Sequence, residues 1–232
     1  MSTVAAEKQV RCEVVILGED QVSIPGWVVD LESFRRWAET DAFPKDGRID
    51  YLNGRVTLDM SKEQVFTHVV VKNEFNYVLT GLSKKEQRGL YLPDGLRLTN
   101  LTADLSGKPD GTFILNDSFD SGRVRLIEGR EEGFVELEGI ADMVLEIISR
   151  SSLHKDTVLL REAYWEAGIP EYWLVDVRQE PLRFDILRHA PKGYVAVRKQ
   201  AGWVKSTVFG KAFHLPQRTN QRGHQEYTLA VR

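Results

Sequence analysis

Residues 142–176 read DMVLEIISRSSLHKDTVLLREAYWEAGIPEYWLVD, and this stretch decides the fold. The apolar run at 143–148 is rich in β-branched residues and predicts a strand that is covered on both faces. Residues 155–167 repeat apolar side chains at helical spacing, and Gly168 follows where a helix would end. Because residues 172–176 predict a second buried strand, we expect two parallel strands joined by a right-handed helical crossover.

Glu146 lies in the middle of the first of these strands. A buried carboxylate without a partner is costly, so this side chain must meet a cation, a metal ion or a network of hydrogen-bond donors, or stay protonated. A buried salt bridge or a structural carboxyl with a raised pKa explains Glu146 as well as a metal ligand does. The strand alone leaves these alternatives open.

Composition favours one domain with short extensions, because the chain has 232 residues of which 42% are apolar. The net charge of −3 gives no global attraction to nucleic acid, although a local cleft can still be basic. A single cysteine, Cys12, excludes an internal disulfide and is typical of a reducing cytosol. No apolar stretch reaches membrane-spanning length, so we expect a cytoplasmic protein without a membrane partner.

The N-terminal part predicts an extension followed by a helix, a hairpin and a second helix. Residues 1–24 look like the extension, and Asp30 is a good N-cap for the first helix. Asn53-Gly54 suits a type I′ turn between two β-rich arms. Residues 61–64 have the pattern of a capping box and predict the start of a long helix.

Two polar residues stand next to apolar patterns in this region. His68 begins the apolar stripe of the long helix, where it is either a hydrogen-bonded core histidine or part of a cleft. Asp110 follows Pro109 and precedes a buried run at 112–115, so it would stand at the entry to a strand. Pro-Asp-Gly is also a common turn sequence, and by itself this second signal is weak.

Taken together, Asp110 and Glu146 predict two carboxylates on neighbouring strands. Such a pair suits Mg²⁺ or Mn²⁺, hard cations that prefer oxygen ligands and keep several waters. The metal would activate a water and neutralise a scissile phosphate, and this chemistry also wants a nearby cationic side chain. Ile148 lies on the same strand face as Glu146, but its apolar side chain cannot supply this positive charge. Lys155 at the start of the crossover helix is the first candidate and Arg161 the second; an ordinary surface lysine is the alternative explanation for Lys155.

The chain beyond residue 176 is β-rich. A turn at 190–193 predicts a hairpin, and two more strands are expected near the C-terminal end. We expect this region to extend the sheet, to form its edge or to build a homodimer contact. Three histidines, at 189, 214 and 224, lack metal-ligand spacing and are interpreted as surface residues.

In several of these residues the sequence resembles the Uma-two family, a group of proposed restriction endonucleases in the PD-(D/E)XK nuclease superfamily. The resemblance runs from about residue 29 to 186 and rests on Gly54, Met60-Ser61, His68, Pro109-Asp110 and, most specifically, on LEIISRSS…KD…AYWEAGIPEYWLVD between Leu145 and Asp176. It implies an α/β fold with a restriction-endonuclease-like core, a mixed central β-sheet flanked by helices, and Mg²⁺-dependent cleavage. It also implies that Asp110 and Glu146 are the two acids of the superfamily motif.

The resemblance has one departure, in the basic residue. The usual lysine is replaced by Ile148, and the position at which many relatives carry a displaced lysine holds Leu160, which leaves Lys155 as the candidate.

For the domain organisation, we expect an extension at 1–24, an endonuclease-like domain at 25–190 and a β-rich C-terminal extension of the same domain at 191–232.

Two functions follow from this reading. The first is a Mg²⁺-dependent endonuclease acting on nucleic acid, DNA in the first instance, with Asp110 and Glu146 on the metal, Lys155 positioning water or phosphate, and His68 lining the cleft. The alternative is a catalytically inactive relative that binds nucleic acid or a protein partner through the same cleft.

Overall fold

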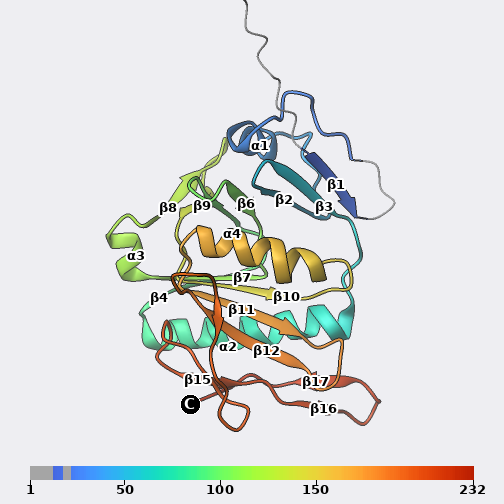
Figure 1. Ribbon diagram of the computed structural model, residues 1–232, viewed down its shortest axis with the longest axis vertical. Coiled ribbons are helices and arrows are strands. Elements are labelled where there is room, and N and C mark those ends of the chain that lie inside the picture. Colours follow the sequence, from blue (N-terminus) through green and yellow to red (C-terminus); the bar gives the residue numbers. More distant parts are fainter. Residues whose placement is uncertain (1–12, 18–21) are drawn as a thin grey trace, which may run out of the picture.

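The structure is a computed structural model that describes residues 13–17 and 22–232. Cys12 and most of the expected extension at 1–24 lie outside the described residues. The described chain is layered: helix α1 covers a seven-stranded sheet, helix α4 lies between that sheet and a six-stranded one, and helix α2 and the C-terminal hairpins cover the far side (Figure 1). The expected α/β class, with helices flanking a mixed sheet, is confirmed.

The six-stranded sheet holds the strand–helix–strand unit at its centre. Its strand order is β13-β12-β11-β10-β7-β4, and only the β10–β11 pair is parallel. The strands are β4 Gly89–Pro93, β7 Gly111–Leu115, β10 Met143–Ile147, β11 Glu171–Asp176, β12 Arg183–Arg188 and β13 Val195–Ala196. The predicted parallel pair is therefore confirmed within a mixed sheet.

The crossover between β10 and β11 begins as a π-helical turn, η2 (Lys155–Leu159), and continues as α4 (Leu160–Glu166). Gly168 has φ +77°, the left-handed conformation expected just beyond a helix end. The helix and its end are thus where the sequence predicts them.

Strand β10 is buried on both faces, and alternate side chains separate two cores. Met143, Leu145 and Ile147 pack with helix α2 (Val70–Glu86), whereas Val144 and Ile148 pack with α4. Because Glu146 alternates with Leu145 and Ile147, its side chain belongs to the α4 side, between the two sheets.

The seven-stranded sheet has the order β1-β3-β2-β6-β5-β9-β8. Its strands are β1 Glu13–Leu17, β2 Arg48–Leu52, β3 Arg55–Asp59, β5 Arg97–Asn100, β6 Leu105–Gly107, β8 Val124–Glu128 and β9 Phe134–Gly139; the short helix α3 (Asn116–Asp120) connects the two sheets. Asn53 and Gly54 both have positive φ, +47° and +77°, as a type I′ turn requires. Helix α1 (Leu31–Ala38) has the predicted cap, in which the Asp30 carboxylate accepts from Ser33 N.

One predicted helix start is wrong. The long helix begins as the π-helical turn η1 (Val65–Val69), after Gln64, rather than at Ser61. The Ser61 backbone amide instead donates to Asp59 Oδ1 over 3.0 Å. Gln64, which would complete the capping box, instead accepts a hydrogen bond from the Thr67 hydroxyl through its Oε1 over 3.0 Å, so its side chain is engaged elsewhere.

The C-terminal region only partly extends the central sheet. Strands β12 and β13 belong to that sheet, but β14 Val204–Lys205, β15 Ala212–His214 and β18 Ala230–Val231 form a three-stranded sheet, and β16 Gln217–Thr219 pairs with β17 Gln225–Tyr227. Phe209 and Phe213 from this region are buried in the core beside helix α2. Within the described part of the chain, no helix is long and apolar enough to cross a membrane.

Candidate active site

Asp110 and Glu146 come from neighbouring antiparallel strands. Asp110 immediately precedes β7, and Gly111 pairs with Leu145 of β10, so the two acidic residues lie at the same end of the strand pair. Asp110 Oδ2 accepts a hydrogen bond from the Ile147 backbone amide over 2.8 Å. Both carboxyl groups are almost fully buried, at 0% and 1% exposure.

One guanidinium joins the two carboxylates. Arg48 opens β2 of the other sheet, and its Nη2 lies 2.5 Å from Asp110 Oδ1 while its Nη1 lies 3.4 Å from Glu146 Oε2. The side chain of Arg48 is 16% exposed, so the guanidinium remains accessible from one side. Sequence analysis missed this residue, because its only local signal is a cation at the start of a strand that is otherwise buried.

The two carboxyl groups differ in protonation. Burial raises the pKa of Asp110, but the positive charge of Arg48 leads the effects that outweigh it, and the pKa falls to about 2. Burial and the neighbouring negative charge of Asp110 instead hold the pKa of Glu146 well above its usual value. Two close carboxyl groups in a buried site do not both ionise easily, so Asp110 ionises first and Glu146 binds its proton more tightly.

Tyr164 of helix α4 completes the contacts of Glu146. Its hydroxyl donates to Glu146 Oε1 over 2.7 Å. The two oxygens of Glu146 are thus held by residues from distant parts of the sequence, Oε2 by Arg48 and Oε1 by Tyr164. Such a contact fixes the orientation of a carboxyl group before any ligand arrives.

The predicted cleft residue His68 lies beside Asp110. Its Nε2 is 3.6 Å from Asp110 Oδ2, and its Nδ1 is 3.5 Å from Glu63 Oε2. Lys72, one turn further along the same helical segment, has its amine 3.8 Å from Asp110 Oδ1. It also pairs with Asp94 at 2.7 Å, so η1 and α2 bring two nitrogen-bearing side chains to Asp110.

Lys155 lies behind the carboxylate pair rather than on it. Its amine is 2.9 Å from Asp50 Oδ2 and 3.8 Å from Asp156 Oδ1, and the residue is 3% exposed. Burial lowers its pKa, but these carboxylates outweigh that effect and keep the lysine charged. Arg161, the second candidate, instead donates to the Tyr194 carbonyl over 2.8 Å.

The two positions at which relatives would carry the lysine hold buried apolar side chains. Ile148 and Leu160 are each 1% exposed and belong to the core between the sheets. Among the described residues, Arg48 is thus the cation that contacts both acids.

A cavity of about 380 Å³ has Arg48 and His68 in its wall, and through these two side chains it adjoins the buried Asp110 and Glu146, which do not line it themselves. Three lysines also line it, Lys45, Lys62 and Lys108, and none of them forms a salt bridge with a described residue. Acidic side chains line it too, namely Asp59, Glu63 and Asp94. Unpaired cations around a buried acidic pair suit a ligand that is itself negatively charged.

The donor set fits a hard divalent cation. In the described ranges no group of three or more His, Cys, Asp or Glu has a metal-binding arrangement, but Mg²⁺ often takes only one or two carboxylates beside waters and substrate phosphates. The buried network contains four carboxyl groups, Asp50, Asp110, Glu146 and Asp156, and two cations within it, Arg48 and Lys155. Burial raises the pKa of Asp156 to about 6 and that of Glu146 well above its usual value, so both groups bind protons more readily than ordinary carboxyl groups do. A divalent cation can take the place of such protons.

Comparison with known proteins identifies the fold and the family. The chain resembles the crystal structure of "a putative nuclease belonging to DUF820" from Anabaena variabilis ATCC 29413, with a TM-score of 0.57 and 17% identity over 78% of this chain and 91% of that one. At this identity the likeness concerns the fold. No curated protein matches the sequence. The Uma2 family, described as "Putative restriction endonuclease", matches residues 31–211. That match spans most of the chain, including both carboxylates and Arg48, and the protein is therefore a member of the Uma2 family.

Proposed function

We propose that the protein is a divalent-metal-dependent endonuclease that hydrolyses phosphodiester bonds of nucleic acid, with DNA as the first substrate to test. One observation carries the proposal: two buried carboxyl groups from adjacent strands are bridged by Arg48, and Arg48 lines a cavity together with three lysines that form no salt bridge with a described residue. Phosphodiester hydrolysis needs both features, because a metal must be held and a polyanion must be attracted. The nuclease-like fold and the family membership support it.

Asp110 and Glu146 would hold Mg²⁺ or Mn²⁺. When bound, the metal would lower the pKa of a water and neutralise charge on the scissile phosphate. Asp110 is already ionised, and its Oδ2 is fixed by the Ile147 amide. Glu146 is oriented by Tyr164, so both acids are already fixed in place for a ligand.

The basic residues take different roles in this proposal. Arg48 supplies the cation next to the reacting centre, because its guanidinium touches both acids and faces the cavity. Lys155 acts as a positioning residue through Asp50 and Asp156. His68 lines the cleft beside Asp110 and can hold a water or a phosphate oxygen there.

The test is cleavage of plasmid and single-stranded DNA with Mg²⁺ or Mn²⁺, together with metal titration by calorimetry. Asp110→Asn and Glu146→Gln are expected to lose both metal binding and cleavage. Asp185→Asn is the matched control, since Asp185 is a partly buried carboxylate of the same sheet that pairs with Arg183 and Lys199. Cleavage that survives in both site variants would rule the proposal out.

A second function, binding of nucleic acid without cleavage, is favoured by a specific contact. Arg48 neutralises the carboxylate pair internally, so the site needs no metal to be stable. If the wild-type protein binds DNA but neither binds metal nor cleaves, this second function replaces the first. The cytoplasmic location expected from the sequence stays a prediction.

A further inference from the structure

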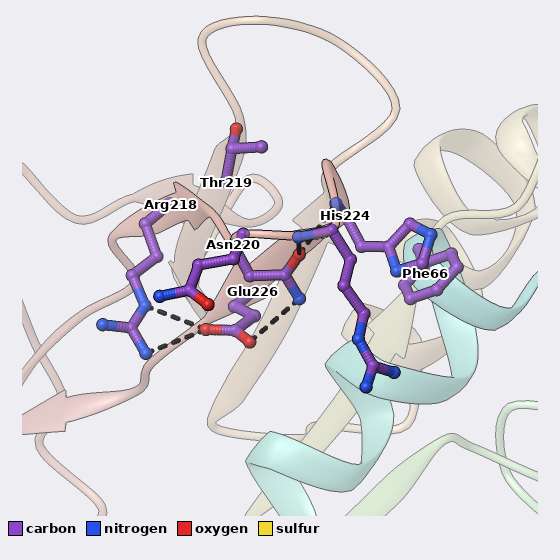
Figure 2. Close-up of a pocket in the computed structure, with 8 residues that line it drawn as sticks. Phe66, Arg218, Thr219, Asn220, His224 and Glu226 are labelled. Carbon is purple, nitrogen blue, oxygen red and sulfur yellow. Dashed lines mark hydrogen bonds and ion pairs between the residues drawn. The ribbon is translucent and has the colours of Figure 1, made fainter.

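A second hollow lies between η1 and the β16–β17 hairpin, with a volume of about 790 Å³ (Figure 2). Its lining residues include Phe66, Arg218, Asn220, Arg222, His224 and Glu226, and we call this surface the hairpin notch. The volume falls in the range of ligand-binding clefts, roughly 300–1,000 Å³. None of the six residues belongs to the carboxylate site described above.

The notch presents an aromatic stack to solvent. Figure 2 shows the rings of Phe66 and His224 against each other. Their centroids lie 4.2 Å apart at an interplanar angle of 26°. Phe66 is 39% exposed, although it is a large apolar side chain at the start of a helix. An exposed, already stacked ring pair offers a flat surface to a third ring, and nucleic-acid bases bind single-strand proteins in this way.

The charges of the notch leave one arginine unpaired. Arg218 binds Glu226, with Nη2 2.8 Å from Oε2, and Asn220 donates to the other carboxylate oxygen over 3.1 Å. The acid of the notch is therefore satisfied within the hairpin, as the dashed lines in Figure 2 indicate. Arg222 is exposed, and its side chain forms no salt bridge or hydrogen bond with any described residue. Its guanidinium is free to bind a phosphate.

The notch adjoins the active-site cavity through one helical turn. Phe66 and His68 are both in η1, Phe66 lining the notch and His68 lining the cavity beside Asp110. Residues two apart in a helix point to nearly opposite sides, so this turn separates the two hollows. Val65 and Val69 on the same turn are 57% and 40% exposed.

We propose that the hairpin notch binds the single-stranded part of the nucleic-acid substrate, with an unpaired base stacked at Phe66 and His224 and a phosphate on Arg222. The inference rests on the proposed function, because it supposes that a phosphodiester lies in the adjacent cavity. The aromatic pair and the free guanidinium match the two halves of a nucleotide, its ring and its phosphate.

The test is binding of a fluorescently labelled oligothymidylate to the full chain in EDTA, measured by anisotropy over a series of salt concentrations. Phe66→Ala removes the stacking ring, and we expect about tenfold weaker binding with an unchanged salt dependence. Arg222→Gln removes one phosphate contact, so the slope of log K against log salt should become shallower by about 0.7. These two signatures are separate and identify the two halves of the site.

The controls are an exposed aromatic and an exposed arginine outside the notch. The control variants are Tyr77→Ala and Arg198→Gln. Tyr77 lies on α2 and is 78% exposed, and Arg198 is exposed and forms no salt bridge with a described residue. The wild-type protein must first bind the oligonucleotide. If the notch variants then have the same affinity and salt dependence as the control variants, the notch inference is overturned and the nuclease proposal stands. If the wild-type protein binds no oligonucleotide even at low salt, the notch inference is overturned, whereas the nuclease proposal is decided by the cleavage assay with Mg²⁺ or Mn²⁺.

Discussion

Tyr164 donates its hydroxyl to the Glu146 carboxyl over 2.7 Å, from the crossover helix back to the strand that precedes it. The strand–helix–strand unit therefore contains both an acidic residue of the site and the group that orients it. Burial first, and then the nearby charge of Glu146, raises the pKa of Tyr164, so the phenol keeps its proton and acts as a donor.

Tyr164→Phe tests the role of this contact. The substitution leaves a buried acceptor without its donor, and we expect a loss of about 1–3 kcal/mol in the free energy of unfolding together with weaker metal binding. Urea unfolding and calorimetric metal titration measure the two effects. Tyr172→Phe is the matched control, because Tyr172 is also fully buried and donates to the Asp156 carbonyl over 2.8 Å. A metal affinity reduced equally in both variants would contradict a specific role for Tyr164.

Arg48→Met removes the cation that joins Asp110 and Glu146. Breaking a buried pair from one side costs about 3–5 kcal/mol, so the variant should be markedly less stable without metal. Mg²⁺ should then restore much of the loss, because a divalent cation can take over the neutralisation of both carboxylates. Thermal unfolding at several Mg²⁺ concentrations measures this, with a larger rise in Tm expected for Arg48→Met than for wild type.

Arg97→Met supplies the comparison for Arg48. Arg97 is a buried arginine of the same seven-stranded sheet, and it donates to the Ile49 carbonyl and to Ser106 rather than to the acidic pair. Its loss should lower stability without changing the response to Mg²⁺. An equal Tm response in the two variants would show that Arg48 does not occupy the place of a metal charge.

The ring of Tyr91 explains why a glycine, Gly111, follows Asp110. A Cβ at this position would lie 2.2 Å from the hydroxyl oxygen of Tyr91, whose own hydrogen bond goes to Asn76 over 2.9 Å. Gly111→Ala must push this ring aside next to the site, so we expect a loss of about 1–3 kcal/mol in stability and reduced cleavage. Tyr91→Phe in the same chain should restore part of the stability. Gly26→Ala, which has no atom within 4 Å, should be close to neutral, and a comparable loss there would refute the steric explanation.

Local pattern predicted the part of the fold that local forces decide. The strand at 143–147, its crossover helix, the left-handed Gly168 and the Asn53-Gly54 turn all depend on neighbours in sequence, and the structure has each of them. The start of the long helix was not predictable in this way. Ser61 and Gln64 match a capping box, yet Gln64 accepts a hydrogen bond from the Thr67 hydroxyl instead, and the helix begins only after it.

The site was predictable only as far as its carboxylates. Asp110 and Glu146 stand out because each is an acid at an apolar strand. Their cation does not, since Arg48 lies 98 residues before Glu146 and in a different sheet. The same limit holds for Lys155, whose place at the helix start follows from the sequence but whose partner, Asp50, lies 105 residues away. Contacts between the two sheets are set by tertiary packing, which residue spacing does not encode.

Asp50 and Lys155 form the buried pair behind the site, and this pair should govern stability in acid. Burial raises the pKa of Asp50, but Lys155 and Arg48 outweigh that effect and bring the pKa below its ordinary value of 3.8. A carboxylate with a lowered pKa stabilises the fold above its unfolded pKa, and this contribution is lost as the pH falls through the folded pKa. Asp156, with its pKa near 6, acts in the opposite direction, because the folded state binds its proton more tightly than the unfolded chain does, so it does not contribute to the loss.

We therefore expect the wild-type protein to lose stability as the pH falls from about 4.5 to about 3, and the double variant Asp50→Asn with Lys155→Met to lose less over the same range. The double variant is used because Asp50→Asn alone leaves the buried Lys155 amine without its closest partner. Urea midpoints at a series of pH values give the comparison. Arg161→Met, which removes a cation hydrogen-bonded to the Tyr194 carbonyl, should keep the wild-type slope. Identical slopes in the wild type and the double variant would mean that the buried pair contributes nothing to acid stability, and Lys155 would then be needed for function rather than for the fold.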